Sequence, residues 1–84
     1  MQIGQIVKST HGHDKNAFYM IVELSGDFVF LADGKSRRLE KAKKKNIKHI
    51  QKTNEILQVD EITGNKKLYS ILSAKNRKLK ETGE

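Results

Sequence analysis

The amino-acid sequence predicts a mainly β fold, a small barrel of about five strands followed by a C-terminal amphipathic helix. Short apolar runs, bounded by turn-forming residues, occupy the first fifty residues of the chain. Short strands linked by hairpins must curl to bury their apolar faces, so a barrel is expected rather than a flat sheet. Only near the C-terminus does the spacing of apolar residues change to that of a helix.

The first three strands are predicted from these apolar runs. Residues 3–9 and 28–32 are rich in β-branched or aromatic side chains, which favour strands. Residues 17–24 form a nearly continuous apolar run that is short and bounded by turn signals, so we expect a buried strand. The segment 10–16 is predicted to be a loop in which Gly12 takes a positive φ.

Turn chemistry and charge predict the next elements. Asp33-Gly34 lies between two strand-like runs, which favours a hairpin turn leading into a basic, partly apolar stretch that ends at Leu39. Residues 40–46 have no apolar face to anchor a helix, so an exposed and mobile loop is expected. Residues 47–50 then form a brief fifth strand.

The last third of the chain predicts a helix. Residues 53–63 suit a strand as well as a turn of helix. Residues 66–80 are predicted to be helical, with Asn65 as N-cap, and residues 81–84 to be frayed. The sequence thus divides into a barrel, 1–53, and a C-terminal extension, 54–84. The helix presents one apolar stripe, made of Leu68, Ile71, Leu72 and Leu79.

Composition limits the classes of protein to consider. The 84 residues suffice for one domain and contain no cysteine, so neither a disulfide nor a thiolate metal site is available. No secretory signal and no apolar run of about 20 residues is visible, so a soluble cytoplasmic protein is expected. The sequence shows no catalytic arrangement or nucleotide-binding glycine motif, so we expect no enzyme and no cofactor. His11 and His13, completed by Asp14 or His49, are the candidate zinc ligands, but zinc needs three or four ligands in fixed geometry and the sequence offers no cysteine or second closely spaced pair, so no metal is expected.

Positive charge is concentrated in one segment. The chain has 17 Lys and Arg against 10 Asp and Glu, a formal charge of +7 and a pI near 9.8. Residues 35–52 alone contain nine basic residues and one acidic residue, a net charge of +8. A local potential of this kind suits a polyanion.

Part of the sequence resembles the KOW motif. Gly4-Gln5-Ile6-Val7-Lys8-Ser9, Gly12-His13-Asp14-Lys15 and the apolar strand 18–22 carry the resemblance. The continuation from Ala32 to His49, with its Asp-Gly-Lys and lysine run, is similar to small bacterial KOW-domain RNA-binding proteins. These resemble a KOW-containing group of archaeal and eukaryotic large-subunit ribosomal proteins. The resemblance covers roughly residues 3–53.

The resemblance implies an SH3-like barrel that binds RNA, often ribosomal RNA, through loops at one end. Asn16 stands where the family usually has a glycine, and Asn tolerates the left-handed conformation better than most residues. Ala42 stands where the family often has a proline, so a looser lysine loop is expected. The expected partners are RNA and ribosomal or other translation proteins, and the expected state is a monomer. The candidate RNA-binding residues are Lys8, His11, Gly12, His13, Lys15, Lys35, Arg37, Arg38, Lys41, Lys43, Lys44, Lys45, Lys48 and His49.

Several of these features have simpler interpretations. The lysine run can be a solvated surface, and the 10–16 loop an ordinary polar turn. Phe18, Tyr19, Phe28 and Phe30 lie within apolar runs, which favours a core position over base stacking. The cations can also meet an acidic protein partner instead of RNA. If RNA is the ligand, the basic segment and the first loop must lie at the same end of the barrel.

Overall fold

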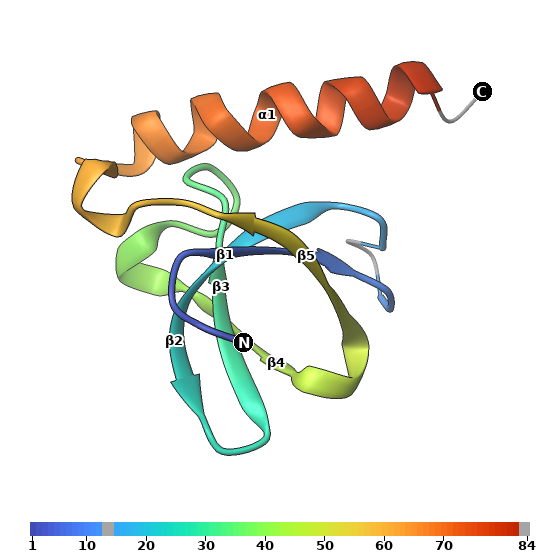
Figure 1. The fold of residues 1–84 in the computed structure, drawn as a ribbon, viewed down its shortest axis with the longest axis vertical. Helices are drawn as coiled ribbons and strands as arrows, with labels where there is room; N and C mark the ends of the chain where they lie inside the picture. The colour runs from blue at the N-terminus through green and yellow to red at the C-terminus, as the bar shows by residue number, and fades with distance from the viewer. Residues whose placement is uncertain (13–14, 83–84) are drawn as a thin grey trace.

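The computed structural model describes residues 1–12 and 15–82, with side chains as far as Lys75, and shows a single antiparallel sheet beneath one long helix (Figure 1). The strands follow the order β4-β3-β2-β1-β5. The prediction of a mainly β fold with five strands and a C-terminal helix is confirmed. The strands are β1 Gln5–Ser9, β2 Phe18–Ser25, β3 Phe28–Ala32, β4 Lys43–Asn46 and β5 Ile50–Ile56. The helices are α1 Asn65–Thr82 and three 3₁₀ turns, η1 Leu39–Lys41, η2 Ile47–His49 and η3 Val59–Glu61.

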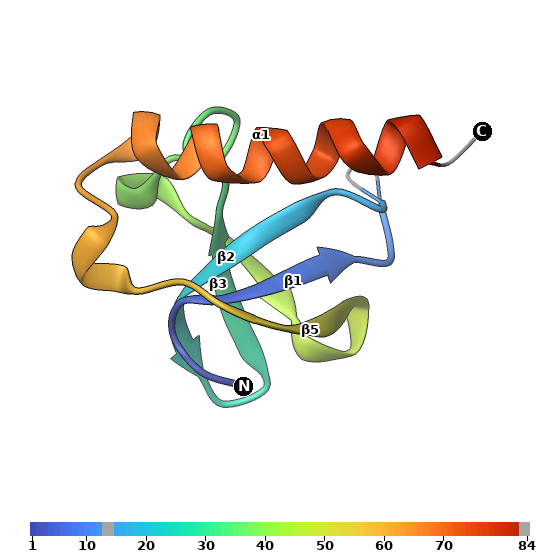
Figure 2. The same ribbon diagram turned by 45° about the horizontal axis from the view of Figure 1, so that its top comes forward.

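The sheet is curled, but its closure into a barrel is not found (Figure 2). Within residues 1–12 and 15–82, β4 and β5 form the two edges of the sheet and pair only with β3 and β1 respectively. The short turn η2 connects these two edge strands directly. The structure is therefore a strongly curled open sheet.

Both faces of the central strands are buried, which explains the nearly continuous apolar run in β2. Tyr19 and Ile21 point into the concave side of the sheet, where they join a cluster with Val7, Val29, Leu31 and Ile50. Met20 points to the opposite face, where it packs with Ile6, Ala32, Leu68 and Leu72 beneath α1. Alternate side chains of one strand thus enter two separate cores.

The helix is part of the fold rather than an appended segment. Leu68 and Leu72 are fully buried, which confirms two positions of the predicted stripe, and Ile71 is half-buried. Leu79 lies beyond the described side chains. The predicted boundary between 53 and 54 falls inside β5. The helix extends beyond the predicted end at residue 80 as far as Thr82, and residues 83–84 of the predicted frayed tail lie outside the described residues.

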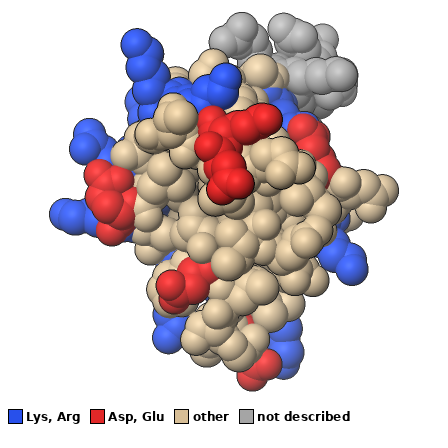
Figure 3. Space-filling view, turned by 60° about the vertical axis from the view of Figure 1, so that its left-hand side comes forward, with Lys and Arg blue, Asp and Glu red and all other residues tan. Residues whose placement is uncertain are grey.

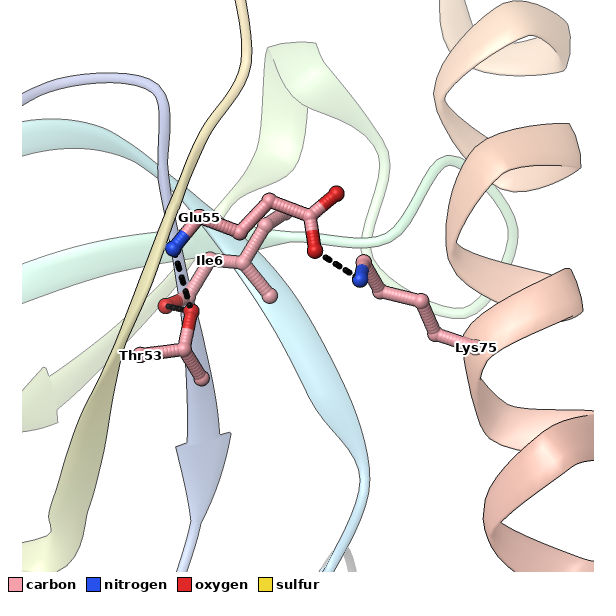
Figure 4. A network of polar contacts seen from close by, with 4 residues as sticks. All are labelled: Ile6, Thr53, Glu55 and Lys75. Atoms are coloured by element: carbon pink, nitrogen blue, oxygen red, sulfur yellow. Dashed lines mark hydrogen bonds and ion pairs between the residues drawn. The ribbon is translucent and has the colours of Figure 1, made fainter.

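Side chains compensate for an irregularity between β1 and β5. The pairing register shifts between Gln5 and Val7. The Thr53 hydroxyl donates to the Ile6 carbonyl at 2.7 Å, and the side-chain Nε2 of Gln5 donates to the Thr53 carbonyl at 2.8 Å. The next residues of β5 reach the helix, where the Glu55 carboxylate pairs with Lys75 (Figure 4). The hydroxyl bond supplies a donor to the Ile6 carbonyl, which a buried backbone oxygen requires.

The predicted Asp33-Gly34 hairpin is wrong. The amides of both residues donate to the Arg37 carbonyl, and a loop from 33 to 38 replaces the expected strand. Gly34 does take a positive φ of 85°, but a side chain there would meet the Asn65 carbonyl oxygen at 2.2 Å and the Tyr69 amide at 2.7 Å. Glycine is required here because the first turn of α1 packs directly on the loop.

The lysine run is not the loose, mobile loop expected from its composition. Within it, Lys43–Asn46 forms β4 and pairs in register with β3, from Leu31↔Lys43 to Phe28↔Asn46. The exposed edge of β3 supplies the hydrogen-bond partners, which a composition argument cannot anticipate. The predicted fifth strand at 47–50 is also wrong, because 47–49 forms η2 and the strand begins at Ile50. In the ambiguous segment, β5 continues to Ile56 and η3 follows.

Asn65 does not act as the predicted N-cap, because its side chain makes tertiary contacts. Its Oδ1 accepts a hydrogen bond from the backbone amide of Leu39 at 2.7 Å, and its Nδ2 donates one to Glu40 Oε1 at 2.8 Å. The hydrogen bond from Asn65 is the main cause that holds the pKa of Glu40 below its ordinary value, with Arg38 and Lys41 adding attraction. One amide thus connects η1 to the start of α1.

We predict that two substitutions of Asn65 separate these contacts. Asn65→Ala loses both bonds, so the pKa of Glu40 should rise toward its ordinary value. Asn65→Asp keeps an acceptor for the Leu39 amide but places a carboxylate beside Glu40, which should raise that pKa further. A carboxyl ¹³C NMR titration of Glu40 measures both effects. Identical titrations in the parent and Asn65→Ala would show that the amide does not control Glu40.

The pH dependence of stability follows from the same lowered pKa. Because the pKa of Glu40 is lower in the folded than in the unfolded protein, its hydrogen bond with Asn65 adds to the free energy of unfolding at pH values above the unfolded-state pKa. It is lost as the pH falls through the folded pKa. The stability difference between the parent and Asn65→Asp should therefore be larger at pH 7 than at pH 3 in thermal unfolding, while an equal difference would contradict this origin.

Candidate nucleic-acid interface

The structure brings the first loop and the end of the basic segment together. The Thr10 amide donates to the His49 carbonyl at 2.9 Å. The rings of His11 and His49 lie with their centroids 4.5 Å apart at an angle of 34°. These contacts join residues that lie almost forty positions apart in the sequence. The expectation that the loop and the basic segment meet at one end of the sheet is thus met for this part of the segment.

Local backbone geometry shapes the first loop. Gly12 has a φ of 89° and Asn16 a φ of 74°, so both adopt the positive φ expected of them. The Asn16 amide donates to the Ser9 carbonyl at 2.7 Å, and the Lys15 amide donates to the Gly12 carbonyl at 3.2 Å. The loop is thus anchored where it leaves β1. His13, one of the predicted RNA-binding residues, lies outside the described residues.

Lys45 lies beneath this loop and is buried, whereas the sequence predicts an exposed RNA-binding residue at this position. Its side chain is only 8% exposed. Its Nζ donates to Ser9 Oγ at 2.8 Å and to the His11 carbonyl at 2.8 Å. Since Lys45 is opposite the buried Val29 in the β3–β4 register, its side chain must point to the concave side of the sheet. Lys45 supports the loop instead of meeting a phosphate directly.

We define the histidine end as His11, Gly12, Lys15, Lys48 and His49, all of which are exposed except where the two rings meet. Lys48 lies in η2, and Asn46 caps the start of this turn. The Asn46 side-chain oxygen accepts a hydrogen bond from the backbone amide of Lys48 at 2.9 Å. Exposed ammonium groups beside imidazole rings offer donors to phosphate oxygens. The paired rings also offer a surface on which an unstacked RNA base can stack.

Other predicted residues belong to different parts of the surface. Lys8 is half-buried on β1, between Phe18 and Gln51 of the neighbouring strands. Lys43 and Lys44 lie on β4, and Lys44 Nζ lies 4.3 Å from the centroid of the Phe28 ring. A further group lies on the loop and turn between β3 and β4, where contacts lead to Asp33, Asn65 and Tyr69. This group contains Lys35, Arg37, Arg38 and Lys41.

The lysines of β4 have a second physical explanation. An edge strand exposes backbone groups that can pair with another chain, and lysine side chains are a common protection against this. Lys44 is exposed and Lys43 half-buried on such an edge. They are therefore weaker candidates for RNA contact than the cations of the histidine end.

Most of the aromatic side chains that were predicted to be core residues are buried or half-buried. Tyr19 is buried and Phe18 and Phe30 are half-buried, as expected for core residues, but Phe28 is 36% exposed beneath Lys44. Among the described side chains, in residues 1–12 and 15–75, no three His, Asp or Glu residues gather as a metal site. In the same part of the chain, no helix has the length and apolar content needed to cross a bilayer.

The supporting role of Lys45 is testable with a matched pair of variants. Lys45→Met should lower the free energy of unfolding by about 1–3 kcal/mol, because Ser9 and His11 lose a buried charged donor. Lys44→Met removes an exposed charge of the same type and should cost less than about 1 kcal/mol. Denaturant unfolding measures both, and hydrogen exchange at Thr10 and Asn16 should accelerate only in Lys45→Met. Equal effects in the two variants would contradict the assignment.

Comparisons with known proteins add no assignment to this geometry. A scan of the sequence against protein-family models finds no match, and a search of curated proteins finds no significant relative.

Proposed function

We propose that this protein is a non-catalytic RNA-binding module whose histidine end contacts RNA phosphates. The observation that carries the proposal is the contact between two distant segments, the first loop and η2, through Thr10, His11 and His49. Lys15 and Lys48 are the exposed cations that lie close in sequence to these contacts, one in each segment. Phosphate backbones require closely spaced donors of this kind.

Electrostatics favours a polyanionic ligand. The chain carries a formal charge of +7, which raises the rate of association with RNA through long-range attraction. The buried ammonium of Lys45 adds to the potential above the loop, since a charge inside the protein is screened less than one in water.

The sequence resemblance suggests the kind of RNA. Small KOW proteins imply an SH3-like module that recognises folded RNA, and ribosomal RNA is the RNA class we propose. The cytoplasm, where ribosomes assemble and translate, is the proposed location, with a monomer as the working state. Because most of the contacts are to phosphates, RNA shape should govern selection more than base sequence.

An acidic protein partner is the alternative that the same cations allow. Co-purification distinguishes the two, because bound RNA raises the ratio of absorbance at 260 nm to that at 280 nm, and salt should remove it. Crosslinking in cells followed by sequencing of the attached RNA then identifies the ligand. Recovery of acidic proteins without RNA would favour the alternative.

We predict that binding to a structured ribosomal RNA fragment falls steeply with salt. If about 5–8 phosphates are neutralised, log K should decrease against log salt with a slope of roughly −4 to −7. Fluorescence anisotropy between 50 and 400 mM KCl measures this slope. A slope near zero would remove the electrostatic basis of the proposal.

We also predict that the position of the charges matters, and not only their number. Lys15→Gln with Lys48→Gln should weaken binding about tenfold or more at 0.1 M salt and reduce the salt slope by about 2, one for each contact. The control is Lys66→Gln with Lys67→Gln, which removes the same charge from exposed positions at the start of α1. Equal losses in the two double variants would mean that RNA does not select the histidine end.

A further inference from the structure

A groove of different chemistry lies at the opposite end of the molecule. In Figures 1 and 2, η1 and η3 lie on the left, whereas the β1–β2 loop and η2 lie on the right. Between η1 and η3 the surface contains an apolar hollow of about 170 Å³. Its lining comes from the N-terminal segment, β2 and both 3₁₀ regions, and consists of Ile3, Met20, Val22, Leu39, Val59 and Ile62.

A second hollow of about 390 Å³ continues the first and is more polar. The two share Val22 and Leu39, so they form one groove. Glu23, Glu40 and Lys41 line the second part. Figure 3 shows this side of the molecule, with a neutral central surface, acidic groups on and around it, and Lys and Arg mainly at the periphery.

The apolar part of the groove leaves aliphatic side chains in contact with water, which is energetically unfavourable. Ile3 is 48% exposed and Val59 is 45% exposed, although both side chains border the hollow. An apolar depression with a polar rim is a feature of docking sites for other molecules. An aliphatic side chain that filled the hollow would remove this surface from water.

The walls of the groove are held in place before any ligand binds. The Leu57 amide donates to the Gly4 carbonyl at 2.8 Å, and a side chain at Gly4 would meet the Leu57 carbonyl oxygen at 2.5 Å. This close approach positions the start of η3 and Val59. On the other wall, the Asn65 side chain fixes Leu39 and Glu40. A preformed groove reduces the entropy that binding must overcome.

The carboxylates in and around the groove indicate that its ligand is positively charged. Glu23 and Glu40 line the groove, and Asp60 and Glu61 lie in η3 between Val59 and Ile62. All four carboxylates are exposed, and Lys41 is the one cation in the described lining. We propose that this groove binds a short basic segment of a protein partner, with an aliphatic side chain in the apolar hollow and Lys or Arg side chains beside Glu23 and Glu40. The carboxylates would repel RNA phosphates, so the groove and the histidine end accept different ligands.

This proposal is tested with synthetic peptides on the ¹⁵N-labelled full chain. The probe is acetyl-Lys-Leu-Ile-Lys-Arg-amide, and its two controls are acetyl-Glu-Leu-Ile-Glu-Glu-amide and acetyl-Lys-Ser-Ser-Lys-Arg-amide. The probe should cause saturable amide shifts at groove residues such as Val22, Leu39 and Ile62, but not at His11 or His49. Binding of either control as tight as that of the probe would overturn the proposal, because it requires both the apolar and the charged contact.

Variants of the protein locate the contact. Val59→Lys at the rim should abolish the shifts, whereas Leu24→Lys, which changes an equally exposed apolar residue outside the lining, should leave them intact. Glu23→Gln with Glu40→Gln keeps the shape of the groove and should weaken the probe about fivefold. Unchanged binding in Val59→Lys would overturn the assignment, provided that its spectrum remains that of a folded protein.

Two further measurements exclude other occupants. Sedimentation of the chain alone should show a monomer, because a concentration-dependent dimer with groove shifts would assign the groove to a second copy instead. Addition of the ribosomal RNA fragment without peptide should leave the amide signals of Val22, Leu39 and Ile62 unshifted, and saturable RNA-induced shifts at these residues would assign the groove to RNA. The groove does not depend on the histidine end, so failure of RNA binding leaves this test unaffected.

Discussion

The whole structure depends on the burial of both faces of its central strands. Tyr19 and Ile21 require a concave core, whereas Met20 requires a cover on the other side of the same strand. The sheet therefore curls around one cluster, and α1 lies across the other (Figure 1). A domain of this size buries a modest fraction of its surface, so neither core is dispensable. The curl and the helix together create the two ends where functional groups gather.

Each end is stabilised by one polar side chain that reaches a distant segment. At one end, the ammonium of Lys45 connects β4 to Ser9 and His11 of the first strand and loop. At the other, the amide of Asn65 connects α1 to Leu39 and Glu40. A buried charge is costly unless its hydrogen bonds are satisfied, which explains why Lys45 is held by short contacts. The exposed pair of Glu55 and Lys75 contributes much less, since water screens it.

The two ends differ in chemistry, and for this reason the two proposals assign them different ligands. The histidine end combines exposed cations with paired imidazole rings. The groove between η1 and η3 combines aliphatic residues with carboxylates. Because the two sites lie at opposite ends of the molecule (Figures 1 and 2), two ligands need not compete for space. Taken together, the two proposals describe a module that holds a basic protein segment close to an RNA.

The sequence by itself determined the strands that depend on local patterns. The apolar run of β2, the β-branched and aromatic residues of β1 and β3, and the stripe containing Leu68 and Leu72 indicate their elements without tertiary information. The positive φ of Gly12 and Asn16 likewise follows from local preferences. The concentration of positive charge suggested a polyanion, although it did not separate exposed from buried cations.

Only the tertiary structure decided the rest, because it depends on partners far away in the sequence. The lysine run became a strand because the edge of β3 offers backbone partners, and alternation then turned Lys45 inward. Asp33-Gly34 became a loop instead of a hairpin because α1 packs against Gly34. The contacts of Lys45 with Ser9 and His11 join positions more than thirty residues apart, as does the pairing of His11 with His49. A pattern along the chain records which side chains are available, whereas burial and pairing determine which of them can meet a ligand.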